Sequence, residues 1–126
     1  MFDYSYDKAS RLLKADFTQK TGSFASSFNF DVLMGNGSDP TQAYDANGNI
    51  KRMQQWGVKA AGAATQIDDL TYTYLNFGAS NKLQKVSESS TTNTPMGLGD
   101  FTDKSTGDDY GYDRNGNLVT DKNKHL

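Results

Sequence analysis

Apolar and polar residues alternate with a period of two over several short stretches of this chain. Aromatic residues occupy every second position over residues 2–6, and apolar residues do so over residues 70–74. A half-buried β-strand has this spacing, because successive side chains point to opposite faces of a sheet. On the strand expected after residue 12, Leu13, Ala15 and Phe17 share one side. The pattern therefore predicts an all-β protein.

A seven-residue pattern recurs along the chain and marks an internal repeat. Residues 44–50 are Tyr-Asp-Ala-Asn-Gly-Asn-Ile, and residues 112–118 are Tyr-Asp-Arg-Asn-Gly-Asn-Leu. Residues 6–12 keep the tyrosine, the aspartate and the final aliphatic residue but lack the Asn-Gly pair. The weakest copy starts at Tyr74 and has a longer turn before Leu83. The repeat is irregular, and insertions of this kind are expected in loops.

Turn chemistry explains the six-residue spacing within the repeat. A two-residue Asn-Gly loop is the usual hairpin, but it would place Tyr44 and Ile50 on opposite faces. A three-residue loop instead begins a type I turn at Asp45 and closes it with Gly48 in the left-handed conformation. Tyr44 then pairs with Ile50. We therefore predict the three-residue loop.

The same construction pairs Tyr6 with Leu12 and Tyr112 with Leu118, and it places each aromatic and aliphatic pair on the buried face of its hairpin. Such cross-strand pairs contribute about 0.2 to 1 kcal/mol each. In the first copy Ser10 occupies the glycine position, where a left-handed backbone costs roughly 1 to 2 kcal/mol. We expect that hairpin to be the least well formed, or to use another type of turn. The repeat assigns structural roles to Tyr6, Asp7, Leu12, Tyr44, Asp45, Gly48, Ile50, Tyr74, Leu83, Tyr112, Asp113, Gly116 and Leu118.

The composition favours a β-sheet protein with a thin hydrophobic core. The 126 residues suffice for one domain, only 35% are hydrophobic, and the aromatic residues comprise seven Tyr, seven Phe and one Trp. Loops are expected over Gly35–Gln42 and Ser87–Gly99, where Ser, Thr, Asn and Gly predominate. We expect a single domain, residues 1–126, of about eight to ten antiparallel strands in successive hairpins.

Charge and cysteine content exclude several classes of function. The net charge of -2 leaves no basic field for nucleic acid or an anionic membrane, and no apolar run is long enough to be inserted in a bilayer. Without cysteine there are no disulfides and no thiolate metal sites. Residues 1–10 lack the features of a signal peptide, and the chain begins inside a repeat. We therefore expect a fragment of a longer chain.

The sequence contains no convincing motif for catalysis or metal binding. Asp45-Ala-Asn-Gly-Asn resembles the opening of a calcium loop, but the glycine and glutamate spacing of an EF-hand is missing. Asp68-Asp69 and Asp108-Asp109 are adjacent pairs that point to opposite faces, so we expect them to keep strand entries soluble and to discourage edge pairing. His125, the single histidine, lies next to the C-terminus. We predict no catalytic residue, no cofactor and no metal.

An aromatic platform for sugars is the remaining candidate site. Trp56, Tyr72 and Tyr110 are its possible glycan contacts, although aromatic residues of a sheet protein more often fill its core. The alternative function is therefore a carbohydrate-binding module.

The repeat resembles the Tyr-Asp (YD) repeats of the RHS family of large bacterial surface or secreted proteins, which are related in their repeats to insecticidal toxin-complex components and teneurins. The matching residues are Tyr, Asp, Gly, Asn and Ile or Leu within 44–50 and 112–118, and the opening phrase of residues 2–7 is similar to Bacteroidetes members.

The resemblance covers about half of the chain and implies a structural role. In that family the repeats form long antiparallel sheets that wrap around a toxic or adhesive cargo and are not catalytic. It implies a secreted or cell-surface location, with neighbouring repeats of the same parent chain as partners. An edge-mediated homodimer and contacts with cell-surface glycans are further expectations.

Overall fold

The computed structural model describes residues 1–18, 29–58, 64–89 and 101–124. These residues form eight strands and one short helix, which confirms the all-β prediction. The elements, in chain order, are β1 (Phe2–Tyr6), β2 (Leu12–Phe17), β3 (Val32–Met34), α1 (Pro40–Ala43), β4 (Arg52–Val58), β5 (Ala64–Tyr74), β6 (Leu83–Glu88), β7 (Tyr110–Tyr112) and β8 (Leu118–Asp121).

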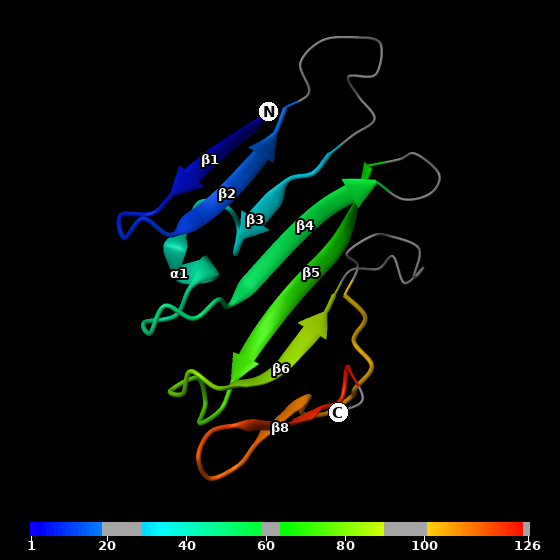
Figure 1. The fold of residues 1–126 in the computed structure, drawn as a ribbon. Helices are drawn as coiled ribbons and strands as arrows, with labels where there is room; N and C mark the ends of the chain where they lie inside the picture. Colours follow the sequence, from blue (N-terminus) through cyan, green and yellow to red (C-terminus); the bar gives the residue numbers. More distant parts are fainter. Residues whose placement is uncertain (19–28, 59–63, 90–100, 125–126) are drawn as a thin grey trace.

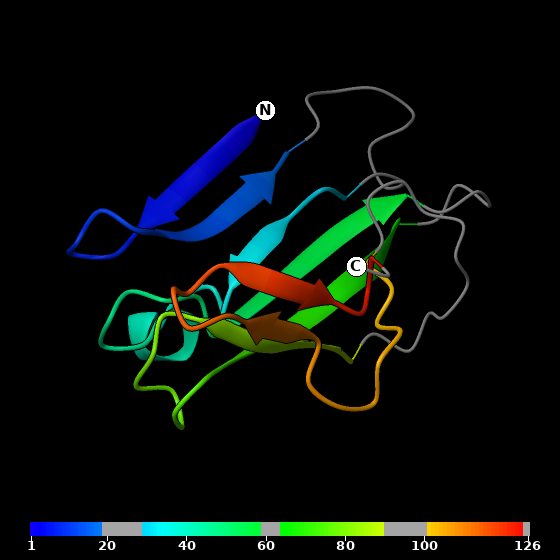
Figure 2. The same ribbon diagram turned by 60° about the horizontal axis from the view of Figure 1, so that its bottom comes forward.

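Six strands form one antiparallel sheet in the order β1-β2-β3-β4-β5-β6, so each strand pairs with its neighbours in the sequence. Strands β7 and β8 form a separate hairpin at the β6 end of this sheet (Figures 1 and 2). The turns of the four repeats follow one another along one side of the molecule in both views. The repeat therefore places equivalent turns next to one another despite its unequal spacing in the sequence.

One hydrophobic cluster lies where the first and second repeats meet. Leu13 from β2, Met34 from β3 and Ala43 from α1 are buried there. Leu12, Val32, Tyr44, Ile50 and Met53 pack around them. The other buried apolar side chains of the described residues are small in number, in keeping with the low apolar content: Ala15, Ile67, Leu70 and Val86.

Helix α1 lies partly inside the predicted Gly35–Gln42 loop, so that prediction was wrong for its last residues. Asp39 caps the helix by accepting a hydrogen bond from the Thr41 backbone N–H at 2.9 Å, and Pro40 occupies the first turn. An Asp-Pro pair is a helix-start signal that sequence reasoning passed over. Similarly, Ser87 and Glu88 belong to β6, whereas residues 90–99 of the second predicted loop lie outside the described residues.

Strand β1 differs from the half-buried strand that its alternation predicts. All five of its residues are exposed, because β1 is an edge strand and no layer of the described residues covers its aromatic face. Leu118 of the last repeat is also 50% exposed, so its pair with Tyr112 is not buried as expected. Strand β1 belongs to the first repeat of the sequence, and Leu118 belongs to the last. No helix among the described residues has the length and apolar character needed to cross a bilayer.

Candidate functional site

The three-residue loop predicted for the repeat is present in its three best copies. In the second copy the Gly48 N–H donates to the Asp45 carbonyl at 3.1 Å, and the Asp45 N–H donates to the Asn49 carbonyl at 2.9 Å. Gly48 has a φ of 84°, in the left-handed region. Tyr44 consequently pairs with Ile50, as the register argument predicted. The Tyr6–Leu12 and Tyr112–Leu118 pairs are likewise formed.

The motif aspartate acts as a hub of hydrogen bonds within its own turn. Oδ1 of Asp45 accepts from the backbone N–H groups of Asn47 at 2.9 Å and Asn49 at 2.8 Å, while Oδ2 accepts from Asn49 Nδ2 at 3.0 Å. Asp113 makes the same three bonds with Asn115 and Asn117. The asparagine at the sixth position of the motif therefore has a role that sequence reasoning missed, although its recurrence in both copies was a usable signal.

These bonds lower the pKa of the motif carboxylates. In Asp113 the side-chain bond from Asn117 lowers the pKa below the usual 3.8. In Asp45, partial removal from water raises the pKa, but the bonds from Asn49 and Asn47 outweigh that effect and the net shift is downward. Hydrogen bonds to the ionised form are the common cause. Every described hydrogen bond to these two carboxylates comes from the same turn. The turn geometry therefore accounts for the hydrogen bonds that lower their pKa values.

The first copy reaches the same geometry with different residues. Ser10 adopts a φ of 61°, as its place in the motif requires. Arg11 replaces the asparagine, and its Nε donates to Asp7 Oδ2 at 2.7 Å. The backbone bond from Arg11 is the largest cause of the lowered pKa of Asp7. Turn formation thus tolerates the missing glycine, at the expense of a strained serine.

The weakest copy, the third in chain order, which starts at Tyr74, also forms a hairpin of the series. Tyr74 pairs with Leu83, and the Leu75 N–H donates to the Lys82 carbonyl at 2.9 Å. Its longer turn passes through positive φ angles at three successive residues, Asn76, Phe77 and Gly78.

A tyrosine hydroxyl joins each repeat to the one before it. Three motif tyrosines donate to the backbone carbonyl of the aliphatic residue that ends the preceding motif. The donors and acceptors are Tyr44 to Leu12 at 2.6 Å, Tyr74 to Ile50 at 2.8 Å, and Tyr112 to Leu83 at 2.8 Å. No local sequence pattern indicates these bonds, because their partners are 24 to 32 residues apart.

Burial raises the pKa of Tyr44 and Tyr74 above the usual 10.0, so both hydroxyls remain protonated donors at neutral pH. Cations from the preceding turn also lie over motif rings. The Arg11 guanidinium carbon is 4.5 Å from the Tyr44 ring centre, and Lys82 Nζ is 5.7 Å from that of Tyr112. Two of the three junctions, those made by Tyr44 and Tyr112, therefore combine a hydroxyl bond with a cation–ring contact.

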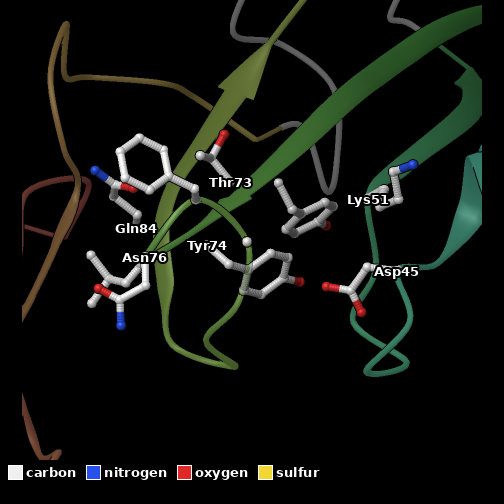
Figure 3. A pocket seen from close by; sticks show the side chains of 10 residues that line it. Asp45, Lys51, Thr73, Tyr74, Asn76 and Gln84 are labelled. Atoms are coloured by element: carbon white, nitrogen blue, oxygen red, sulfur yellow. The ribbon is translucent and has the colours of Figure 1, made fainter.

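An open hollow of about 600 Å³ lies where the second and third turns meet (Figure 3). Asp45 and Lys51 come from the second turn, and Thr73, Tyr74, Asn76 and Gln84 come from the β5–β6 hairpin. Tyr72, Leu75, Phe77 and Gly78 complete its lining. Phe77 is fully exposed. The hollow has the aromatic and polar surface of a shallow ligand site, without a converging acid, base and nucleophile.

The three residues expected to contact glycans do not all share this hollow. Tyr72 lines it. Trp56 pairs with Gln66, six residues before Tyr72 on β5, which corresponds to about 20 Å along a strand. Tyr110 is near enough to Tyr72 to contribute to the raised pKa of Tyr72, after the larger effect of burial. Tyr72 and Tyr110 thus lie near each other, whereas Trp56 lies on β4, about six residues away from Tyr72 along the strand direction.

For one carboxylate of each adjacent pair, the prediction of a solvating role was wrong. Asp68 and Asp109 are 2% and 0% exposed, so neither keeps a strand entry soluble. Oδ1 of Asp68 accepts from the Phe101 N–H, and Oδ2 of Asp109 accepts from the Val86 N–H at 2.9 Å. The described residues contain no cluster of three or more metal-ligating side chains. His125 lies outside the described residues.

No model of a known protein family matches the sequence. No curated protein and no solved structure matches it either.

Proposed function

We propose that the chain is a non-catalytic structural segment of a secreted or cell-surface scaffold of the RHS kind, built from successive Tyr-Asp hairpins. The observation that carries the proposal is the use of the motif side chains. The aspartate holds its own turn, the glycine closes it, and the tyrosine hydroxyl binds the preceding repeat. The motif aspartates and three of the four motif tyrosines are thus engaged in folding, which supports a structural role. The resemblance to YD repeats supports the location and the parent architecture.

A second candidate is carbohydrate binding, which the hollow between the second and third turns favours. A fully exposed Phe77 beside the half-buried Tyr72 offers ring faces on which a sugar could stack. Asp45, Asn76 and Gln84 offer polar groups around those rings. This arrangement suits a weak site for neutral sugars better than a catalytic centre.

A glycan array combined with thermal melting separates the two functions. For a scaffold we expect no saturable binding and a melting temperature that added oligosaccharide leaves unchanged, because a ligand specific to the folded state would raise it. Saturable binding that Phe77→Ala or Trp56→Ala abolishes would overturn the scaffold proposal. Phe30→Ala is the matched control, since Phe30 is a 40% exposed aromatic residue away from the hollow.

A further inference from the structure

Two of the four repeat turns carry a dipeptide that can react with itself. The turn of the second repeat contains Asn47-Gly48, and that of the last contains Asn115-Gly116. The backbone nitrogen of the following residue can attack an asparagine amide, and glycine hinders this attack least because it has no side chain. In the other turns Ala9-Ser10 takes the place of the pair, or Asn76 is followed by the bulky Phe77. The reaction is therefore favoured at two turns only.

The amides of the two turn asparagines are available for this reaction. The side chains of Asn47 and Asn115 are exposed and make no hydrogen bond to any described residue. Asn36, in the third Asn-Gly pair of the sequence, differs from them. Its Oδ1 accepts from the backbone N–H groups of Ser38 at 3.0 Å and Asp39 at 2.8 Å, which hold the amide in place. Only the turn asparagines thus have amides that are free to rotate.

The attacking nitrogens, in contrast, are held by the closed turn. The Gly48 N–H donates to the Asp45 carbonyl at 3.1 Å, and the Gly116 N–H donates to the Asp113 carbonyl at 3.1 Å. On the other side of the amide, the Asn47 N–H donates to Asp45 Oδ1 at 2.9 Å. Attack requires the glycine nitrogen to lose its proton and the backbone of the asparagine to rotate, so both bonds oppose it. The turn therefore protects its own reactive pair.

We propose that Asn47 and Asn115 are sites of spontaneous succinimide formation, which the closed turn suppresses and local opening of the turn permits. The Gly48 nitrogen loses its proton and forms a bond to Cγ of Asn47. The Cγ–Nδ2 bond then breaks, and Nδ2 takes up a proton and leaves as ammonia. Water opens the succinimide ring at either of its carbonyl carbons and gives aspartate or isoaspartate at position 47. The inference goes beyond the proposed scaffold function and does not depend on it.

The two products have different effects on the turn. Aspartate leaves the backbone unchanged. Isoaspartate carries the backbone through its side chain and adds one carbon atom between Tyr44 and Ile50, whose pairing depends on the length of the loop. The turn that the bond from Gly48 to Asp45 closes then no longer fits. An opening that ends in isoaspartate should therefore weaken the hairpin permanently.

Peptide mass spectrometry of the full chain tests the proposal. The folded protein and the same protein in guanidinium chloride are incubated at alkaline pH, and the deamidated fraction at each asparagine is followed with time. We expect Asn47 and Asn115 to react at least about 10-fold more slowly in the folded chain, because the turn must open first. Equal rates in the two conditions, or no reaction in guanidinium chloride, would overturn the proposal.

Asp45→Ala tests whether the turn is what protects Asn47. The substitution removes the carboxylate that accepts from Asn47 and Asn49, whereas the turn around Asn115 stays intact. Loss of these bonds should raise the rate at Asn47 roughly 5-fold or more and leave that at Asn115 unchanged. Asp113→Ala is the matched variant and should have the reverse effect. A folded Asp45→Ala protein in which Asn47 reacts at the wild-type rate would contradict the proposal.

A milder variant serves if Asp45→Ala unfolds the chain, which would accelerate the reaction at all three Asn-Gly pairs together. Asn49→Ala removes the Nδ2 donor to Asp45 Oδ2 at 3.0 Å and keeps the backbone bonds of the turn. It should raise the rate at Asn47 roughly 2- to 13-fold, as expected for one hydrogen bond, and leave Asn36 and Asn115 unchanged. Equal acceleration at all three pairs, in a chain that circular dichroism shows to be folded, would refute local opening as the cause.

Discussion

The Tyr74 hydroxyl donates a 2.8 Å hydrogen bond to the backbone carbonyl of Ile50, which ends the motif before it. The same relationship joins Tyr44 to Leu12 and Tyr112 to Leu83. The acceptor is always backbone, so the bond depends on where the strand lies and not on which aliphatic residue occupies it. This explains how a repeat of unequal length keeps one type of junction.

Removing the Tyr74 hydroxyl tests the strength of this junction. We expect Tyr74→Phe to lower the free energy of unfolding by about 1 kcal/mol, because the Ile50 carbonyl loses its donor while the packing of the ring is kept. Urea denaturation monitored by circular dichroism measures the change. Tyr6→Phe is the matched control, since the Tyr6 hydroxyl has no hydrogen-bond partner among the described residues. Equal stability of Tyr74→Phe and the wild type would contradict the structural role of the bond.

The left-handed backbone of Gly48 should make this turn sensitive to any residue with a Cβ atom. Gly48→Ala should destabilise the protein by roughly 1 to 2 kcal/mol through its φ of 84° alone, because a Cβ there would meet no atom within 4 Å. Gly107→Ala is the control, as that site is equally open and its φ lies outside the positive region.

The reverse change is expected at the first turn. Ser10 holds a φ of 61°, so Ser10→Gly should relieve strain and raise the melting temperature. An unchanged or lower melting temperature would argue against this turn geometry. Gly48→Ala adds backbone strain at one turn and Ser10→Gly removes it at another. Opposite changes in stability would therefore identify backbone strain, and not side-chain contacts, as the cause.

Local chemistry explains why the turns could be predicted from the sequence. Aspartate, glycine and the six-residue spacing act within a single loop, so the Tyr44–Ile50 pairing follows from neighbouring residues. Exposure could not be predicted in the same way. The alternating pattern of β1 is that of a half-buried strand, but whether its aromatic face is covered depends on what packs there, which no local pattern specifies.

The residues of the candidate site were predicted only in part, because some of their contacts are local in sequence and others are not. The motif residues were identified from their recurrence, whereas the hydroxyl acceptors lie far away in sequence and are backbone atoms that leave no mark on composition. Asp109 is another instance, since its burial depends on β6, more than 20 residues earlier in the chain.

The lowered pKa values of the motif aspartates predict a dependence of stability on pH. A carboxyl group whose pKa falls on folding contributes stability that is present above its unfolded value, 3.8, and is lost as the pH falls through the folded value. We therefore expect the free energy of unfolding to decline as the pH is lowered below about 4. Asp45→Asn should reduce the steepness of that decline. Asp3→Asn, on the exposed β1, is the control for the loss of one charge.

Asp109 should be the most sensitive carboxylate outside the motifs. It is fully buried, its N–H donates to the Gln84 carbonyl at 2.9 Å, and its Oδ2 accepts from the Val86 N–H at 2.9 Å. In this way Asp109 occupies the outer edge of β6 and attaches the β7–β8 hairpin to the sheet. Asp109→Ala would leave the Val86 N–H without an acceptor in a buried place, so we expect a loss of about 1 to 3 kcal/mol.

Two further variants decide whether the carboxylate itself is responsible for that loss. Asp109→Asn keeps an oxygen that can accept from the Val86 N–H, so it should be less damaging than alanine. Asp108→Ala removes the adjacent carboxylate, which is exposed and, within the described part of the chain, bonded to Gln84 Nε2 alone at 2.9 Å, and it should change stability little. Equal losses for Asp108→Ala and Asp109→Ala would show that the hairpin is held by something other than the buried bond to Val86.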